Sequence, residues 1–198
     1  MANWTINTDS NPSHGRSRKG ASSPAISYFP ESTAASTAVI KVGDICSQDT
    51  TVSTGGFRIR QAYRAGGTGS NLLAIGQHIV GVAAESSTGG GALTGGSSEG
   101  VGLVQTPKIG VFPADPETEF LGYLGHIVAA AVSASSLIGL QRSVRYDSTN
   151  HVYLIDSTNS TVALRTVTIT GIPDGTAGDT NGPVYFKFLS SNVSEAVS

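Results

Sequence analysis

The chain has 198 residues, of which 13% are charged, and its net charge is −2. This balance creates no overall electrostatic field that would attract nucleic acid or a membrane surface. The 25 glycines, together with many Ser and Thr and few Lys, Glu and Leu, favour strands and turns over helices. We therefore expect an all-β fold, a small β-barrel or β-sandwich of about 9–11 short strands with little helix.

The single cysteine, Cys46, excludes a disulfide within the chain, and we expect it to be a small buried strand residue. Residues 5–19 are polar, so the N-terminus carries no apolar core of a signal peptide. No run of about 18 apolar residues is present that could span a membrane. These features predict synthesis in the cytoplasm without ordinary export.

Residues 1–36 differ from the rest and are predicted to form an extended N-terminal arm, followed by a β-domain over residues 37–198. The arm is rich in Asn, Ser, Thr and Pro, and its prolines prevent a continuous helix. Apolar residues are nevertheless spaced along it, and Trp4 is the only tryptophan of the chain, a residue type that often dominates binding energy at interfaces. We expect the arm to lie across a neighbouring subunit, and the alternative is a disordered tail.

A basic cluster at residues 14–20 lies within this arm. Its three Arg and Lys charges are few for nucleic-acid binding, so an acidic patch on another protein is the expected partner. The candidate interface residues are Trp4, Ile6, Arg16, Arg18, Lys19, Tyr28 and Phe29.

The stretch from residue 38 to residue 85 contains three predicted strands. Residues 38–42 are apolar and run into a turn at Gly43 and Asp44, and residues 57–63 alternate apolar and polar side chains. Residues 79–84 form a continuous apolar run that ends at Glu85, typical of a strand covered on both faces. Gly81 in this run would allow another backbone to approach closely.

This order of an entry strand with a Gly-Asp turn, a strand with one polar face and an Ile-Val-Gly-Val-Ala-Ala-Glu strand resembles the small β-barrel proteins that decorate or cement the heads of tailed phages. The resemblance covers residues 37–189. It implies a virion structural protein that binds the outer surface of an icosahedral head and bridges capsid subunits. It also implies the major capsid protein and copies of the chain itself as partners, with a homotrimer at local threefold axes. Neither nucleic acid nor membrane is expected as a partner.

Residues 86–100 are rich in glycine, but they lack the order of a phosphate-binding loop, and we interpret them as a mobile loop. Strands are predicted at residues 101–104, 107–113 and 118–125, and the last of these is compatible with the family pattern. Residues 126–132 are alanine-rich and remain open between helix and strand. Residues 133–139 could form one helical turn.

The tetrapeptide Asp-Ser-Thr-Asn occurs twice, at residues 147–150 and 156–159, and predicts two turns. A three-stranded meander of residues 142–146, 151–155 and 161–170 would follow. Within the third strand the apolar residues change from even-numbered to odd-numbered positions. This change predicts a β-bulge at Arg165 and Thr166. Residues 183–189 should end the fold with alternate apolar side chains directed inward.

No enzyme activity is expected, because the four histidines are scattered and no metal-binding or serine-nucleophile motif is present. No cofactor or metal is expected either. Asp115, Glu117 and Glu119 are interpreted as a solvated loop, although a glycosidase-type pair of distant carboxylates stays open. Asp44 and Glu85 are expected to bind backbone or arginine partners. The alternative function is a receptor-binding or carbohydrate-binding β-domain of a phage tail or fibre.

Overall fold

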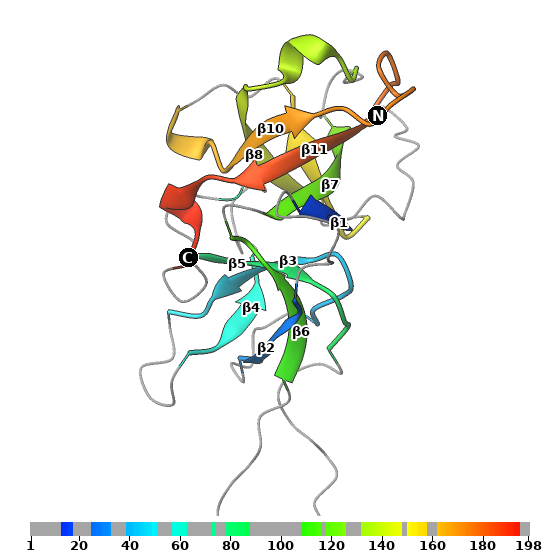
Figure 1. Ribbon diagram of the computed structural model, residues 1–198. Helices are drawn as coiled ribbons and strands as arrows, with labels where there is room; N and C mark the ends of the chain where they lie inside the picture. Colours follow the sequence, from blue (N-terminus) through cyan, green and yellow to red (C-terminus); the bar gives the residue numbers. More distant parts are fainter. Residues whose placement is uncertain are drawn as a thin grey trace, which may run out of the picture.

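The computed structural model describes residues 13–17, 25–32, 39–50, 57–62, 73, 78–87, 108–115, 118–125, 132–147, 150–157 and 162–194. In this part of the chain the fold is all-β, with eleven strands and three short 3-10 helices. The strands form two sheets, which lie one above the other in Figure 1. The predicted all-β fold with a small β-barrel and little helix is confirmed.

The first sheet contains a closed barrel. Its strand order is β1-β7-β11-β10-β8-β9, and β7 also pairs in parallel with β9, so the last five strands close into a ring. The strands are β1 (Ser13–Ser17), β7 (Thr118–Gly125), β8 (Gln141–Asp147), β9 (Val152–Asp156), β10 (Val167–Gly171) and β11 (Pro183–Phe188).

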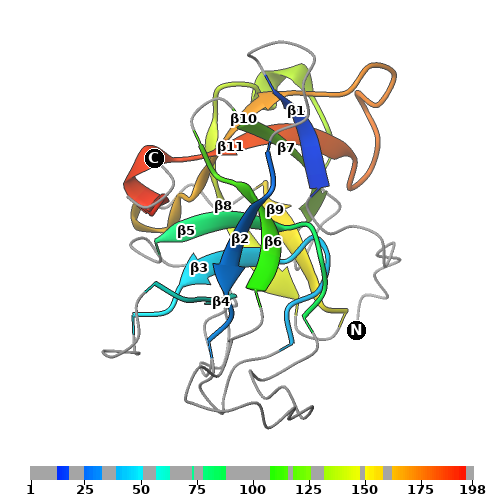
Figure 2. The ribbon, with the colours of Figure 1, turned by 60° about the horizontal axis from the view of Figure 1, so that its bottom comes forward.

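The second sheet has five strands in the order β2-β6-β5-β3-β4. An isolated parallel bridge between Glu31 and Ile59 joins the end of β2 to β4, so this sheet also curls toward closure. Figure 2 shows β2 and β6 crossing in front of β5 and β3. The strands are β2 (Ser27–Pro30), β3 (Ile45–Gln48), β4 (Ile59–Gln61), β5 (Ile79–Ala83) and β6 (Lys108–Pro113).

The three 3-10 helices are single turns in the connections. They are η1 (Ser135–Leu137), η2 (Val162–Leu164) and η3 (Ser190–Asn192). Residues 133–139, which the sequence left open, contain η1, which begins after Ala134 and is not capped by a side chain.

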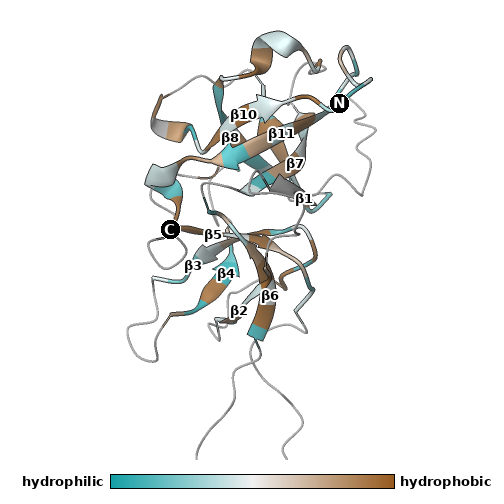
Figure 3. Cartoon of the chain, viewed as in Figure 1, coloured by the Kyte–Doolittle hydropathy of each residue, from teal (hydrophilic) through white to brown (hydrophobic). Residues whose placement is uncertain are grey.

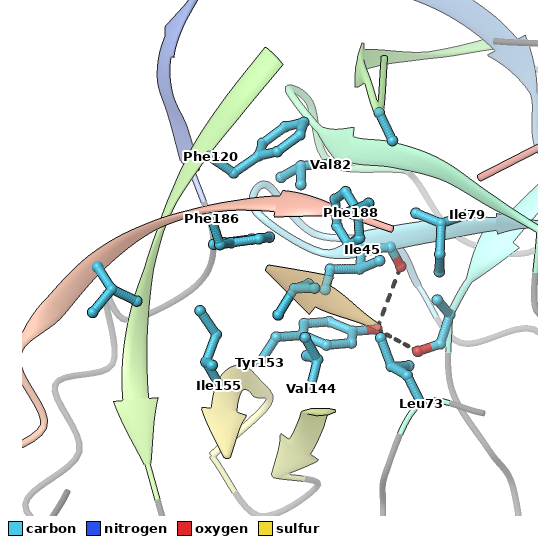
Figure 4. Close-up of a cluster of buried hydrophobic side chains, with 14 of the residues drawn as sticks. Ile45, Leu73, Ile79, Val82, Phe120, Val144, Tyr153, Ile155, Phe186 and Phe188 are labelled. Atoms are coloured by element: carbon cyan, nitrogen blue, oxygen red, sulfur yellow. Dashed lines mark hydrogen bonds between the residues drawn. The ribbon is translucent and has the colours of Figure 1, made fainter. Parts of the chain in front are cut away.

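A large apolar core lies between the barrel and the second sheet. The barrel contributes Phe120, Tyr153 and Phe186, and the second sheet contributes Ile45 and Val82 from the strands that face the barrel (Figure 4). Brown strands on both sides of this junction mark the same apolar contact in Figure 3. Because one core serves both sheets, the two layers stabilise each other.

A second, smaller core lies on the other face of the second sheet. It contains Ile40, Cys46, Ile59, Val80, Ala83, Ile109 and Val111, with Phe29 and Phe57 packed against it. Ile79 and Val82 of β5 therefore enter the large core and Val80 and Ala83 the smaller one, which is why the whole strand is apolar and buried. The predicted strand with both faces covered is confirmed, and so is the buried position of Cys46.

Several strands lie where the alternation of apolar residues predicts them. Residues 118–125 form β7, and the side chains of Val184, Phe186 and Phe188 in β11 enter the core while Tyr185 and Lys187 remain partly exposed. In the predicted hairpin turn, the carboxylate of Asp147 accepts a hydrogen bond from the backbone N–H of Asn150 at 3.2 Å. These elements follow from local rules that need no knowledge of the partner strand.

Three predictions about strand order and limits are wrong. Residues 39–42 are not a strand: the chain turns at Gly43, whose φ is 84°, and β3 follows the turn. The last three strands are not a meander, because β10 pairs with β8 and leaves β8 between β9 and β10. The change in the spacing of apolar residues before β10 reflects η2 and not a bulge at Arg165 and Thr166. An irregularity in the pairing of β10 with β11 lies instead between Ile169 and Gly171.

Two segments of the predicted N-terminal arm are strands of the chain's own sheets. β1 pairs with β7, and β2 pairs with β6. The predicted boundary near residue 36 falls among residues 33–38, which lie outside the described residues, as do the predicted strand at 101–104, residues 126–131 and most of the glycine-rich stretch.

Candidate functional site

A chain of polar side chains runs from the surface into the junction of the two sheets. His151 Nδ1 lies 2.9 Å from the hydroxyl of Tyr146, and Gln61 Nε2 donates to that hydroxyl at 3.3 Å. Gln61 Nε2 also donates to Asp44 Oδ2 at 2.8 Å, and the backbone N–H of Lys41 donates to the same oxygen at 2.8 Å. His151 is exposed, whereas the other three side chains are buried. The chain of contacts thus connects a surface imidazole with a buried carboxyl group.

Burial raises the pKa of Asp44 to about 6, while the hydrogen bonds from Lys41 and Gln61 partly oppose this shift. A raised pKa is common at active sites, but structural groups show it as well. Asp44 is fully buried, so a substrate could not reach it, and its contacts join the turn before β3 to β4. We assign it a structural role, in agreement with the prediction that it binds the backbone.

The remaining buried ionisable groups lead to the same conclusion. Burial raises the pKa of the Cys46 thiol and that of Tyr153 far above their ordinary values, so neither is a nucleophile near neutral pH. Burial also raises the pKa of Glu31, an effect that Ser87 partly offsets. Asp49 accepts a hydrogen bond from Ser32 and lies 3.6 Å from Arg60, which links the chain after β2 to β4.

The prediction that residues 115–119 form a solvated acidic loop is wrong for Glu119. This residue is fully buried in β7. Asp115 accepts hydrogen bonds from both the backbone N–H and the hydroxyl of Thr118, each at 2.8 Å, and so fixes the start of β7. Glu117 lies outside the described residues. Of the two acidic residues that the structure describes here, Asp115 holds a turn and Glu119 is buried.

Within the described residues, no group of three or more His, Cys, Asp and Glu side chains could hold a metal ion. The same part of the chain contains no helix long and apolar enough to cross a bilayer.

An exposed apolar surface is the strongest candidate for binding. We call it the Glu85 surface and define it by Ile26, Tyr28, Val39, Val42 and Glu85. The four apolar side chains are between 41% and 57% exposed, well above the level of a core residue. Large exposed apolar side chains in one region often mark a site of protein–protein contact.

Two segments bring these residues to the end of β5. The hydroxyl of Tyr28 donates to Glu85 Oε1 at 3.3 Å, and the backbone N–H of Gly110 donates to Glu85 Oε2 at 3.4 Å. On the other side, the backbone N–H of Val42 donates to the hydroxyl of Ser86 at 3.2 Å. Glu85 thus lies between β2 and the segment that contains Val39 and Val42, and it binds a backbone group as predicted.

The space above Gly110 explains why β2 can lie so close. A Cβ atom on Gly110 would be 2.9 Å from Ile26 Cγ2 and 3.1 Å from Glu85 Cδ. Only a residue without a side chain leaves room for both neighbours at this point. The local sequence of β6 therefore positions Ile26 and Glu85 side by side.

The predicted interface residues have different positions in the structure. Tyr28 is 56% exposed and belongs to the Glu85 surface. Phe29, by contrast, is partly buried against the smaller core of its own chain, with its ring centroid 5.4 Å from that of Phe57. Arg16 lies in β1 at the register position of Glu119. Trp4, Ile6, Arg18 and Lys19 lie outside the described residues.

Sequence reasoning missed Val39 and Val42, because their apolar character suggested a strand. The signal that could have found them is the adjacent Gly-Asp turn, since turns lie at the surface and expose apolar residues beside them. In a comparison of the chain with known proteins, no protein-family model, curated protein or solved structure matches it.

Proposed function

We propose that the chain is a structural binding protein that attaches to the outer surface of an icosahedral phage head and bridges capsid subunits. The resemblance of its sequence motifs to head decoration proteins suggests this partner. The observation that carries the proposal is the Glu85 surface, where two segments with exposed apolar side chains flank the residues that follow β5. A surface of this kind suits contact with another protein.

The buried ionisable groups favour binding over catalysis. Asp44, Glu31 and Glu119 are all fully buried, and each lies in or beside a strand of the body. A catalytic carboxylate must reach its substrate within hydrogen-bond distance, either directly or through one water. The described carboxylates with raised pKa values are closed to such contact, so we assign them to the fold.

Binding at a head surface would act through many weak contacts. A standard protein interface buries about 800 Å² on each partner. Several copies, each joined to its neighbours, would multiply the effective affinity without any larger patch. A protein that binds only the assembled shell stabilises that shell by mass action. The proposal includes a homotrimer, the arrangement that the resemblance implies.

A sedimentation experiment tests the proposal. Purified protein is mixed with empty heads of the phage that encodes it, after external proteins have been stripped from them, and binding is measured by co-sedimentation. Tyr28→Ala combined with Val42→Ser should weaken binding at least about tenfold, since truncation of interface anchors typically costs more than 1 kcal/mol. Val162→Ser, which changes an apolar residue that is 69% exposed elsewhere on the chain, is the matched control.

Negative-stain images of the same mixtures separate the two functions. Regular knobs on the heads support the proposal, whereas density at tail tips would support the receptor-binding alternative. Absence of the wild-type protein from stripped heads would refute head binding. Equal binding by the wild type and by the Tyr28 and Val42 double variant would refute the role of the Glu85 surface.

A further inference from the structure

One edge of β7 is shared between two different strands. β9 pairs in parallel with the second half of β7, from Tyr123 to Gly125. β1 pairs antiparallel with the first half, from Thr118 to Leu121. The other edge of β7 belongs to β11. β1 therefore fills the length of edge that β9 leaves open.

β1 is not required for the barrel to close. The ring of β7, β11, β10, β8 and β9 is complete without it, and β1 pairs with no described strand other than β7. Its ladder is short and contains a register shift between His14 and Arg16. Removal of β1 would break this one ladder and leave the barrel intact.

The edge nevertheless needs an occupant. Unpaired backbone groups on an exposed strand edge are a template for another strand. Thr118 and Glu119 in this part of β7 are buried, and a buried charge is costly without an opposite charge nearby. Arg16 of β1 stands directly opposite Glu119 in the register, and opposite charges at such positions stabilise a strand pair. The site thus favours a strand with a basic residue at this position.

We propose that the edge of β7 from Thr118 to Leu121 is an acceptor site that takes β1 from a second copy of this chain, so that copies exchange their first strands. This inference concerns the chain alone and goes beyond its proposed attachment to a head. Exchange preserves every contact of the closed form, since the same strand meets the same edge. Only the chain that donates the strand changes.

The connection after β1 sets the reach of the exchange. β1 belongs to the barrel and β2 to the second sheet, and nine residues, 18–26, separate them in the sequence. A fully extended connection of that length spans about 30 Å. β1 can therefore reach the β7 edge of a copy that packs alongside, but not that of a distant one. Exchange should accordingly increase with protein concentration and with crowding of copies on a surface.

Mixed cysteine variants test the proposal on the full-length protein. Ser13 and Leu121 are register partners. One chain carries Ser13→Cys, and a second chain, tagged to differ in mass, carries Leu121→Cys. The two are mixed at high concentration, oxidised mildly and separated on a non-reducing gel. The native Cys46 is buried and does not compete.

The matched control replaces Leu121→Cys with Tyr123→Cys. Tyr123 lies two residues further along β7, is similarly half-buried, and pairs with β9 and β11 instead of β1. We expect disulfide heterodimers of the Ser13 and Leu121 variants at least about tenfold above the control, because exchange gives this pair a high effective concentration. Equal and low yields in both mixtures, from folded protein, would overturn the proposal.

Reversing the charge of Arg16 in one variant and of Glu119 in another provides a second and independent measurement. Arg16→Glu places two acidic residues opposite each other, and Glu119→Arg places two basic ones there. When either variant is alone, positions 16 and 119 carry charges of the same sign, whether β1 comes from the same chain or from a second copy. In a mixture of the two, only exchange between different chains restores opposite charges. Size-exclusion chromatography should then show a mixed dimer that neither variant forms alone, and its absence from a mixture of folded variants would count against the proposal.

Discussion

The hydroxyl of Tyr153 donates a hydrogen bond to the carbonyl oxygen of Ala62 at 3.0 Å, across the junction between the barrel and the second sheet (Figure 4). Tyr153 belongs to β9, and Ala62 follows β4. The same hydroxyl lies 3.4 Å from the carbonyl oxygen of Ile45. A single buried phenol thus binds one backbone carbonyl group of the other sheet and lies close to a second, from a different segment.

Tyr153→Phe should lower the free energy of unfolding by about 1–3 kcal/mol, because it removes the hydrogen bond to the carbonyl oxygen of Ala62 while keeping the ring in the core. Urea unfolding followed by circular dichroism measures the change. Tyr123→Phe, at a half-buried position of β7, is the control and should change stability by less than about 0.5 kcal/mol. Equal stability of the Tyr153 variant and the wild type would show that the junction does not depend on this bond.

Asp44→Asn should reduce the dependence of stability on pH. Burial raises the pKa of Asp44 from an ordinary value of 3.8 to about 6, so between these values the folded protein binds the proton more tightly than the unfolded chain. Its contribution to stability is therefore largest below about pH 4 and is lost as the pH rises through 6, by up to about 3 kcal/mol. Urea unfolding at intervals from pH 4 to pH 7 measures the slope.

Part of the slope should remain in the Asp44→Asn variant, since burial also raises the pKa of Glu31 and acts in the same direction. The exposed Asp174→Asn is the control, because it makes the same change of side chain at the surface. If Asp44→Asn and Asp174→Asn give the same slope, the titration of Asp44 is not coupled to folding.

Gly81→Ala should destabilise the fold by about 2 kcal/mol or more, because the new methyl group would collide with the backbone of β6. A Cβ atom there would meet the carbonyl oxygen of Phe112 and lie 2.8 Å from Val111 Cγ1. Gly175→Ala is the comparison, since its φ of 78° imposes strain but nothing lies within 4 Å. Its cost should stay near about 1 kcal/mol. Thermal unfolding compares the two, and a larger loss at Gly175 would contradict the close approach of β5 and β6.

Phe186→Ala should cost about 3–5 kcal/mol, because it opens a cavity in the core shared by the two sheets. The ring of Phe186 is fully buried and lies 5.8 Å from that of Phe120, centroid to centroid. Tyr185→Ala removes a neighbouring aromatic ring that is directed away from this core, and its cost should stay below that of Phe186→Ala. Similar losses of unfolding free energy for the two variants would mean that the side chains of β11 do not alternate between the core and the surface.

Local patterns in the sequence were enough to predict several strands. The alternation in residues 183–188 and the continuous apolar run at residues 79–83 reflect which faces of a strand are covered, a property that each strand carries by itself. Gly81 was correctly interpreted as a point of close backbone approach, because only a missing side chain permits it. The turn at Asp147 follows from its side-chain bond to Asn150.

Strand partners could not be predicted in this way. β8 lies between β9 and β10, and β7 pairs in parallel with β9, although nothing in the individual strands specifies either neighbour. The Glu85 surface depends on the same long-range arrangement, since Tyr28 and Val42 come from separate segments.

The sequence by itself determined that this chain is built of strands and turns, because glycine, β-branched residues and alternating apolar positions act over a few neighbours. The tertiary structure alone decided that Glu119 is buried, that Phe29 packs against the smaller core while Tyr28 stays exposed, and that β1 completes the edge of β7. Each of these depends on backbone hydrogen bonds and packing between segments up to about 100 residues apart, and such pairings leave no mark on any one segment.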